Sequence, residues 1–308
     1  MKKNSISAVV SVFNGERTLD DCLKSLSFAD EIIVVNSSST DRTLEIAKRH
    51  TETIFTRPNN FMLNVNKNFG FSKAKGEWIL SIDADERVTK ELGEEIEEQI
   101  GNWKLEIGNS VNGYWIPRKN IIFGKWIKHA GWYPDHQLRL FRNGFGKFEE
   151  KHVHEMIKVT GKVEYFKNNM IHYNYNSVSQ FLQKLQIYAP NEARNLIEGG
   201  YRFRWQDAIG FPAKEFISRF FARGGYKDGF HGLMLSVFMA FYHFVVFANI
   251  WEKRRFERIE RNLLEAAAIE FGKSYKDFLF WIDSETLRTI KNPFKKIAYK
   301  LLRKIRRT

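Results

Sequence analysis

Two aspartates, Asp83 and Asp85, stand one residue apart directly after the apolar segment 77–82. Two like charges at the end of a buried segment are costly unless a cation neutralises them. A divalent ion with oxygen ligands removes that cost and can also bridge the phosphates of a diphosphate. The pair therefore predicts a site for Mg²⁺ or Mn²⁺ that stabilises a diphosphate leaving group. An acidic turn in solvent is the alternative interpretation of so short a motif.

The first hundred residues have the pattern of elements that could hold such a site. Short apolar segments rich in β-branched residues alternate with segments of helical spacing, which predicts strands at 6–13, 31–35, 53–55 and 77–82 and helices at 18–26, 39–48, 62–74 and 89–100. Such alternation implies a mostly parallel sheet with helices on both faces. Ligands of these sheets bind at the carboxyl ends of the strands. The polar clusters 14–16, 36–39 and 83–85 all follow strands and should meet at that edge.

The pattern changes after residue 101. Strands are expected at 113–123, 137–141 and 163–173, a helix at 178–196, and only helices from Pro212 onward. This change places soft domain boundaries near residues 100 and 200.

Several of these segments resemble a known family. Residues 6–14 (ISAVVSVFN), 32–41 (IIVVNSSSTD) and 76–86 (GEWILSIDADE) are similar to the family 2 glycosyltransferases of the GT-A fold. Residues 132–142, 153–155 and 225–232 resemble a narrower branch, the bacterial enzymes of the lipopolysaccharide core that are similar to core β-1,4-glucosyltransferases. The resemblance covers roughly residues 5 to 255.

The resemblance implies an α/β fold of the GT-A type, with a Rossmann-like, mostly parallel sheet, followed by a helical, membrane-associating C-terminal region. Residues 1–100 would form the nucleotide-sugar-binding half, 101–200 the acceptor-binding half, and 201–308 the helical region with a basic tail. The implied activity is inverting transfer of a sugar, expected to be glucose, from a UDP-sugar donor to a lipopolysaccharide-core or similar membrane glycolipid.

The same resemblance assigns roles to residues at the strand ends. Those expected to contact the nucleotide, the metal or both are Phe13, Asn14, Glu16, Asn36, Asp41, Lys67, Asn68, Asp83 and Asp85. Asn36 departs from the family, which usually carries Asp there. If residue 36 reads the base edge, the amide changes an acceptor into a mixed donor and acceptor, so the expectation of uridine rests on the fold more than on this residue.

Inverting transfer also needs a general base that takes the proton of the acceptor hydroxyl. Glu155 is the first candidate by its place in the family pattern, and Asp135 is the second, although Glu155 could instead form an exposed ion pair with Lys151 or Lys158. Two histidines, His154 and His172, could be metal ligands, but a structural role is the commoner one. Arg139 and Arg142 could pair with acceptor phosphates or with surface carboxylates.

The formal net charge of +13 is concentrated at the end of the chain, where residues 287–308 hold nine Lys or Arg and no carboxylate. Apolar residues recur there at helical spacing, namely Phe294, Ile297, Ala298, Leu301, Leu302 and Ile305. A basic amphipathic helix is typical of a segment that lies on an anionic membrane, each cation adding about 1 kcal/mol. A solvated charged tail is the alternative.

Segment 233–251 is apolar but interrupted by polar residues, which favours a buried or interfacial helix over a span.

The single cysteine, Cys22, excludes an intrachain disulfide, and the first residues lack the apolar stretch of a signal peptide. We therefore expect a cytoplasmic protein, peripheral to the inner face of the cytoplasmic membrane.

Three alternatives remain open: transfer to a polyprenyl phosphate, a non-enzymatic basic module that binds membrane or nucleic acid, and a nucleotidyltransferase. The last two are disfavoured, because the sequence has neither a basic-aromatic nucleic-acid motif nor a Gly-rich phosphate loop, and we expect no nucleic-acid partner.

Overall fold

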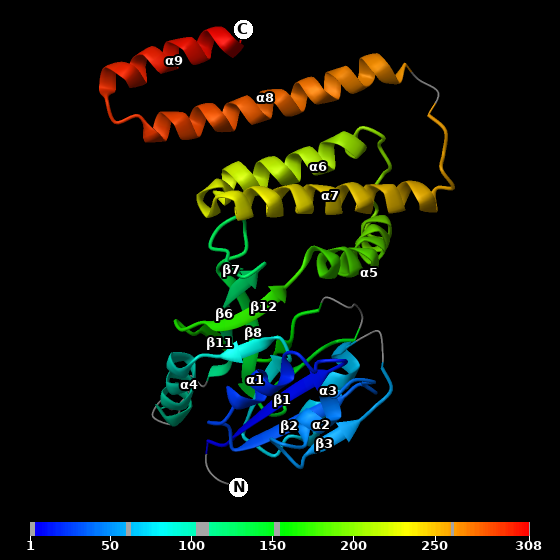
Figure 1. The fold of residues 1–308 in the computed structure, drawn as a ribbon, viewed down its shortest axis with the longest axis vertical. Coiled ribbons are helices and arrows are strands. Elements are labelled where there is room, and N and C mark those ends of the chain that lie inside the picture. Colours follow the sequence, from blue (N-terminus) through cyan, green and yellow to red (C-terminus); the bar gives the residue numbers. More distant parts are fainter. Residues whose placement is uncertain (1–3, 60–62, 103–110, 151–154, 260–261, 308) are drawn as a thin grey trace. The chain divides into compact units, whose positions relative to one another are not determined.

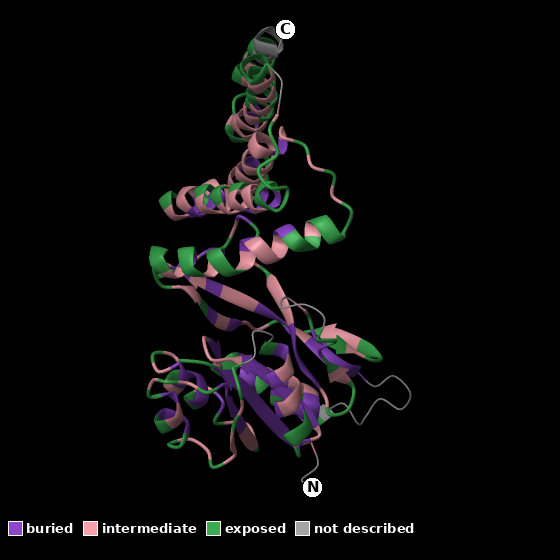
Figure 2. Ribbon diagram, turned by 90° about the vertical axis from the view of Figure 1, so that its right-hand side faces the viewer, coloured by how far each residue is buried: buried purple, intermediate pink, exposed green. Residues whose placement is uncertain are grey.

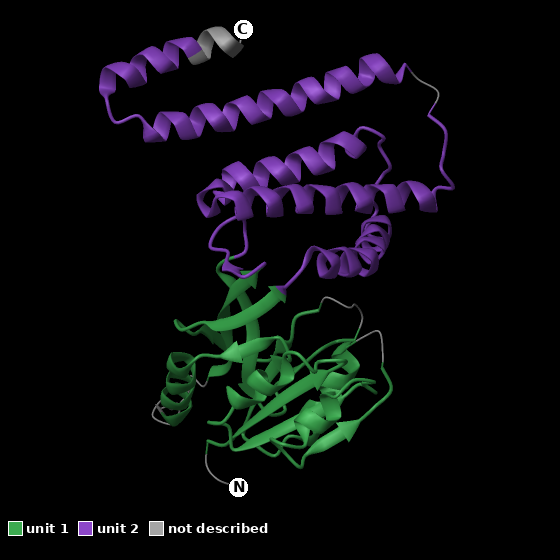
Figure 3. Ribbon diagram, viewed as in Figure 1, with its two compact units in different colours: residues 1–122, 133–174 green, residues 123–132, 175–308 purple. Residues whose placement is uncertain are grey.

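The computed structural model describes residues 4–59, 63–102, 111–150, 155–259 and 262–307, with side chains as far as Leu302. The chain divides into two compact units (Figure 3). Residues 1–122 and 133–174 form the sheet unit, and residues 123–132 and 175–308 form the helical unit. These divisions do not coincide with the boundaries expected near residues 100 and 200.

The first half of the sheet unit has the predicted alternation (Figure 1). Its strands are β1 (Ile6–Val12), β2 (Glu31–Asn36), β3 (Ile54–Thr56) and β4 (Trp78–Asp83), which pair in parallel in the order β3-β2-β1-β4. Its helices are α1 (Leu19–Lys24), α2 (Thr43–Ala47) and α3 (Leu63–Lys73). The predicted α/β class is confirmed.

The second half turns the sheet from parallel to mixed. Strand β4 pairs antiparallel with β8 (Asp135–Arg142), which pairs antiparallel with β6 (Val111–Ile122), and the order continues to β12 (Met170–Tyr175) and β5 (Glu86–Val88). Strand β11 (Lys162–Tyr165) runs parallel to β6, helix α4 (Lys90–Asn102) follows β5, and β9 (Gly146–Lys147) pairs with β10 (Lys158–Val159).

Segment 163–173, expected as one strand, is two. The chain leaves β11 at Phe166, whose ring stacks on Tyr114 at 4.5 Å between centroids, and it re-enters the sheet as β12. This ring is buried in the larger core cluster of the sheet unit.

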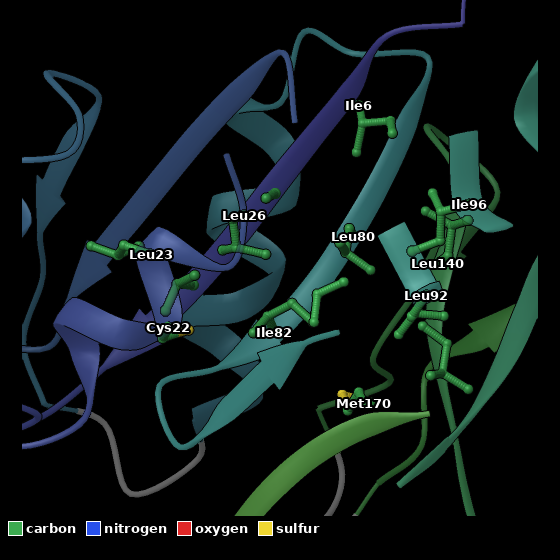
Figure 4. Packing of buried hydrophobic residues seen from close by; sticks show 14 of the residues in the cluster. Ile6, Cys22, Leu23, Leu26, Leu80, Ile82, Leu92, Ile96, Leu140 and Met170 are labelled. Atoms are coloured by element: carbon green, nitrogen blue, oxygen red, sulfur yellow. The ribbon is translucent and has the colours of Figure 1, made fainter. Parts of the chain in front are cut away.

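The core of the sheet unit lies on both faces of the sheet. Every residue of β1 is buried. Its even-numbered residues pack with α1 and α4 in the larger cluster, and Figure 4 shows Ile6, Leu23, Leu80 and Ile96 from this cluster together. Helix α3 covers the other face, where Gly70 is essential: a Cβ at this position would lie 2.5 Å from Val9 Cγ1. The missing side chain lets α3 approach the sheet closely and so sets the position of Lys67 one turn earlier.

The helical unit contains β7 (Lys125–Trp126) and the helices α5 (Val178–Glu198), α6 (Asp207–Ile217), α7 (Phe230–Lys253), α8 (Leu263–Thr289) and α9 (Pro293–Arg307). A π-helical turn, Ser218–Ala222, and a 3₁₀ turn, Gly225–Asp228, lie between α6 and α7. Asp228 accepts hydrogen bonds from the backbone N–H groups of Lys128 and His129, so the 123–132 segment is tied to this turn. The expected helical C-terminal region is confirmed, and its helices show many exposed and intermediate residues (Figure 2).

Candidate active site

Asp83 lies at the carboxyl end of β4 and is held by two cations. Lys67 Nζ of α3 lies 2.5 Å from Oδ1, and Arg139 of β8 donates to Oδ2. Burial alone would raise the pKa of Asp83, but the charges of Arg139 and Lys67 and their hydrogen bonds outweigh it and hold that pKa well below its usual range. Both carboxylate oxygens of this expected metal ligand are therefore already in contact with cationic groups.

A second carboxylate, Glu86, lies behind Asp83 and is fully buried. Its Oε2 accepts the backbone N–H of Asp83 at 2.9 Å, and its Oε1 accepts from Arg139 at 2.7 Å and from Arg118 at 3.0 Å. Buried charges need partners of opposite sign, and Glu86 has two. Glu86 is not among the site residues predicted from the sequence, because β5, which carries it, is too short for a periodic pattern. The signal that remains is a third carboxylate directly after the Asp83–Asp85 pair.

Arg139 does not have either role expected of it. It is 5% exposed and pairs with Asp83 and Glu86 inside the sheet unit, so it is available neither to an acceptor phosphate nor to the surface. Arg142 of the same strand lies 3.6 Å from Glu77, which is the carboxylate pairing expected as its alternative.

Asp135, the second candidate for the general base, continues this chain of alternating charges. Its Oδ2 accepts from Arg118 Nε at 3.0 Å and from Asn120 Nδ2 at 3.1 Å, and its Oδ1 accepts from Gln137 Nε2 at 3.0 Å. Burial opposes ionisation, but the charge of Arg118 and these hydrogen bonds prevail and lower the pKa of Asp135. A carboxylate with a lowered pKa and occupied lone pairs is a poor proton acceptor.

Asp85 faces His172 of β12, with Oδ2 and Nε2 3.6 Å apart. The tautomer of His172 follows from the hydrogen bonds behind it. Because the Asp135 carboxylate only accepts, the Nδ2 group of Asn120 must point to it, and Asn120 Oδ1 then accepts from His172 Nδ1 at 2.7 Å. In the neutral ring the lone pair of Nε2 therefore points toward the Asp85 carboxylate. A carboxylate oxygen and an imidazole nitrogen that face each other are two of the ligand types that divalent ions accept.

The polar loops after β1 and β2 are bonded to each other. Asn14 donates its backbone N–H to Ser39 Oγ at 2.9 Å, and Glu16 donates its backbone N–H to Asp41 Oδ2 at 3.0 Å. Asn36 is 2% exposed; its Oδ1 accepts the backbone N–H of Ser39 at 3.1 Å. The sequence expectation that 14–16 and 36–39 meet at one edge is thus met in the structure, and Phe13 beside them is 44% exposed.

Glu155 is connected to the helix that carries Lys67. Its Oε2 accepts the backbone N–H of Glu150 at 2.7 Å, and Glu150 Oε1 accepts from Asn68 Nδ2 at 2.7 Å. Lys158, one of the two lysines expected as alternative partners of Glu155, pairs with Glu149 at 2.7 Å. His154 and Lys151 lie outside the described residues.

Comparison with known proteins identifies the domain. Residues 7–155 match the family model described as glycosyl transferase family 2. The chain is 27% identical over 259 residues to the lipopolysaccharide core biosynthesis glycosyltransferase LpsC of Rhizobium meliloti, covering 82% of this chain and 93% of that protein. It is also 27% identical over 263 residues to an uncharacterized glycosyltransferase of Rickettsia typhi, covering 82% and 88%. Among solved structures, Staphylococcus aureus TarS 1–349 in complex with UDP matches with a TM-score of 0.44 at 15% identity, over 83% of this chain and 93% of that one. Residues 7–155, which include most of the polar edge of the sheet, therefore match a family 2 glycosyltransferase domain.

Proposed function

We propose that the chain transfers a sugar, with inversion, from a UDP-sugar to a lipopolysaccharide-core or similar membrane glycolipid. The observation that carries this proposal is the likeness to a lipopolysaccharide core glycosyltransferase over 82% of the chain and 93% of the relative. Glucose is the sugar we expect, as in the core glucosyltransferases that segments 132–142 and 225–232 resemble.

The donor site is the polar edge of the sheet. Phe13 and Asn14, with the 36–41 loop, would bind the base and ribose, since these two loops are bonded together and Phe13 is 44% exposed. Lys67, which already neutralises Asp83, would compensate the charge of the diphosphate. Asn36 Oδ1 accepts a hydrogen bond from the backbone of its own loop. Asn36 would therefore hold the shape of the donor site and not only contact the base edge.

A divalent ion, Mg²⁺ or Mn²⁺, fits Asp85 better than Asp83. Among the described residues no three His, Cys, Asp or Glu side chains gather into a complete metal site. Asp85 and His172 nevertheless supply one carboxylate and one imidazole lone pair facing it, and a nucleoside diphosphate would supply further oxygens. When bound, such an ion would neutralise the charge that develops on the leaving diphosphate. Asn120 and Asp135 would hold the His172 ring in the required tautomer.

Glu155 is our candidate for the general base. It is an acceptor tied to α3 through Glu150 and Asn68, whereas Asp135 is saturated by Arg118, Asn120 and Gln137. Glu155 would take the proton of the acceptor hydroxyl as its oxygen attacks the anomeric carbon.

The acceptor is a membrane glycolipid in this proposal, and α9 supports it. This helix carries the exposed apolar residues Phe294, Ile297, Leu301 and Leu302 among lysines and arginines, as expected of a helix on an anionic surface. The protein would then act at the cytoplasmic face of the inner membrane, without a nucleic-acid partner.

The test is an acceptor assay with radiolabelled UDP-glucose and Mn²⁺, offering truncated lipopolysaccharide core in one reaction and polyprenyl phosphate in the other. Label in the core band, lost in Glu155→Gln but retained in the neighbouring Glu149→Gln control, is the expected result. Label in the polyprenyl phosphate alone would show that this lipid, and not the lipopolysaccharide core, is the acceptor. Failure to label either lipid with any UDP-sugar would refute the proposal.

A further inference from the structure

Helix α7 (Phe230–Lys253) is long and apolar enough to cross a membrane by length and composition. Its exposed large side chains all fall on one side. They are Phe230, Val237, Phe241, Phe244 and Trp251, each 39% to 73% exposed. These positions are separated by seven, four, three and seven residues, the spacing of one helical face. We call this set the α7 stripe.

The opposite face of α7 is covered by α5 and α6 of the same unit. Val246 and Ile250 are buried against Ala189 and Ala193 of α5. Phe247 packs on Phe211 of α6, with ring centroids 6.3 Å apart. One side of the helix therefore packs on α5 and α6, whereas the stripe stays partly exposed. At its end Trp251 packs on Phe256, with ring centroids 5.1 Å apart, and donates its indole N–H to the Glu257 carbonyl at 3.0 Å.

Polar contacts in the middle of α7 lie on this covered side. Tyr242 donates its hydroxyl hydrogen to Glu192 of α5 at 2.5 Å. His243 lies 4.0 Å from Glu192 and 3.7 Å from Glu215 of α6. If α7 crossed the bilayer, residues 242 and 243 would sit near its centre and would draw both carboxylates into hydrocarbon. Charges buried in hydrocarbon are costly, which disfavours a span.

We propose that α7 lies flat in the surface of an anionic membrane, with the α7 stripe in the boundary between headgroups and acyl chains. A Phe- and Trp-rich face is suited to that boundary. The exposed Lys227 stands before the stripe. After it the exposed Lys253, Arg254, Arg255 and Arg258 outnumber the exposed Glu252 and Glu257, which complements anionic lipid. This inference rests on the membrane part of the proposed function and adds to it a second contact, separate from α9.

The spacing of the stripe allows a direct test, because positions 230, 237, 244 and 251 are each seven residues apart. In a spanning helix each step changes the depth by about 10 Å, whereas in a flat helix all four lie at one depth. Cysteines introduced at these exposed sites can be labelled selectively, since Cys22 is fully buried and burial raises the pKa of its thiol. Glu98→Cys, at an exposed position of α4, provides a reference in water.

The four variants and the reference carry a fluorophore in the full-length chain and are mixed with phosphatidylglycerol–phosphatidylcholine vesicles. Depth is read by quenching with lipids brominated at different carbons, and sedimentation is measured on the same samples. Equal depths at the four sites, with an unquenched reference, are expected. Depths that change stepwise would overturn the inference in favour of a span. Sedimentation without quenching at α7 would overturn it but leave the α9 contact standing. If the chain does not sediment with the vesicles at all, the membrane part of the proposed function is wrong as well. UDP binding, measured separately, would still test the donor site.

Discussion

Arg139→Met removes the cation shared by Asp83 and Glu86 and replaces it with an apolar side chain of similar length. Breaking a buried ion pair by removing one partner costs about 3–5 kcal/mol. Asp83 keeps Lys67 and Glu86 keeps Arg118, so we expect the lower end, about 3 kcal/mol. That loss raises the unfolding constant roughly a hundredfold. With a urea dependence of about 2 kcal/mol per molar, the midpoint should fall by about 1.5 M.

The assay is the reactivity of Cys22 with a thiol reagent at increasing urea. Cys22 is the only cysteine and is fully buried in the sheet unit, so its exposure reports the unfolding of that unit independently of the helical one. Arg142→Met is the matched control, because it lies on the same strand but is partly exposed beside Glu77. A partly exposed pair of this kind is worth less than about 1 kcal/mol.

The pH dependence has a definite sign. The pKa of Asp83 is lowered in the folded chain, so its ion pairs stabilise the fold above the ordinary carboxyl pKa, about 4, and that stabilisation is lost as the pH falls from there through the lowered value. The cost of Arg139→Met should therefore be constant between about pH 6 and 8 and shrink in acid. A cost at pH 7 equal to that of Arg142→Met would refute the buried charge network.

Three further predictions follow from other parts of the chain. Gly70→Ala should destabilise the sheet unit by about 1–3 kcal/mol in the Cys22 assay, because its Cβ would meet Val9 at 2.5 Å, whereas Gly101→Ala, with open space, should not. Asn120→Leu should weaken Mn²⁺ binding in the presence of UDP about 10- to 100-fold, because Asn120 would no longer orient His172. The affinity is measured by electron paramagnetic resonance, and an unchanged affinity would exclude this role of Asn120. Removal of residues 291–308 should lower sedimentation with anionic vesicles without changing UDP affinity; equal sedimentation would exclude α9 as a membrane contact.

Much of the sheet could be predicted from the sequence because burial on both faces leaves a continuous apolar segment. This is why β1, β2 and β4 match their predicted ranges to within a residue or so. The meeting of the 14–16 and 36–39 clusters also followed, because parallel strands bring their carboxyl ends to one edge.

The interactions that decide the chemistry of the site could not be predicted in the same way. The contact of His172 with Asn120 joins residues 52 positions apart, and the pairing of Arg139 with Asp83 joins residues 56 apart. Nothing local indicates such contacts, since they depend on the order β4-β8-β6-β12 of the strands in the sheet. The expectation for Arg139 was wrong for this reason: a strand predicted over 137–141 does not show which carboxylates of neighbouring strands lie beside Arg139.

The most direct test of the donor site is calorimetric titration of UDP into the wild-type chain and into Asp85→Ala, each with and without Mn²⁺. We expect Mn²⁺ to strengthen UDP binding to the wild type and Asp85→Ala to abolish this gain. Protection of Cys22 from a thiol reagent checks that the variant keeps its fold. Equal UDP binding by both proteins under both conditions would contradict the metal site at Asp85. No UDP binding by the wild-type chain would contradict the proposed donor.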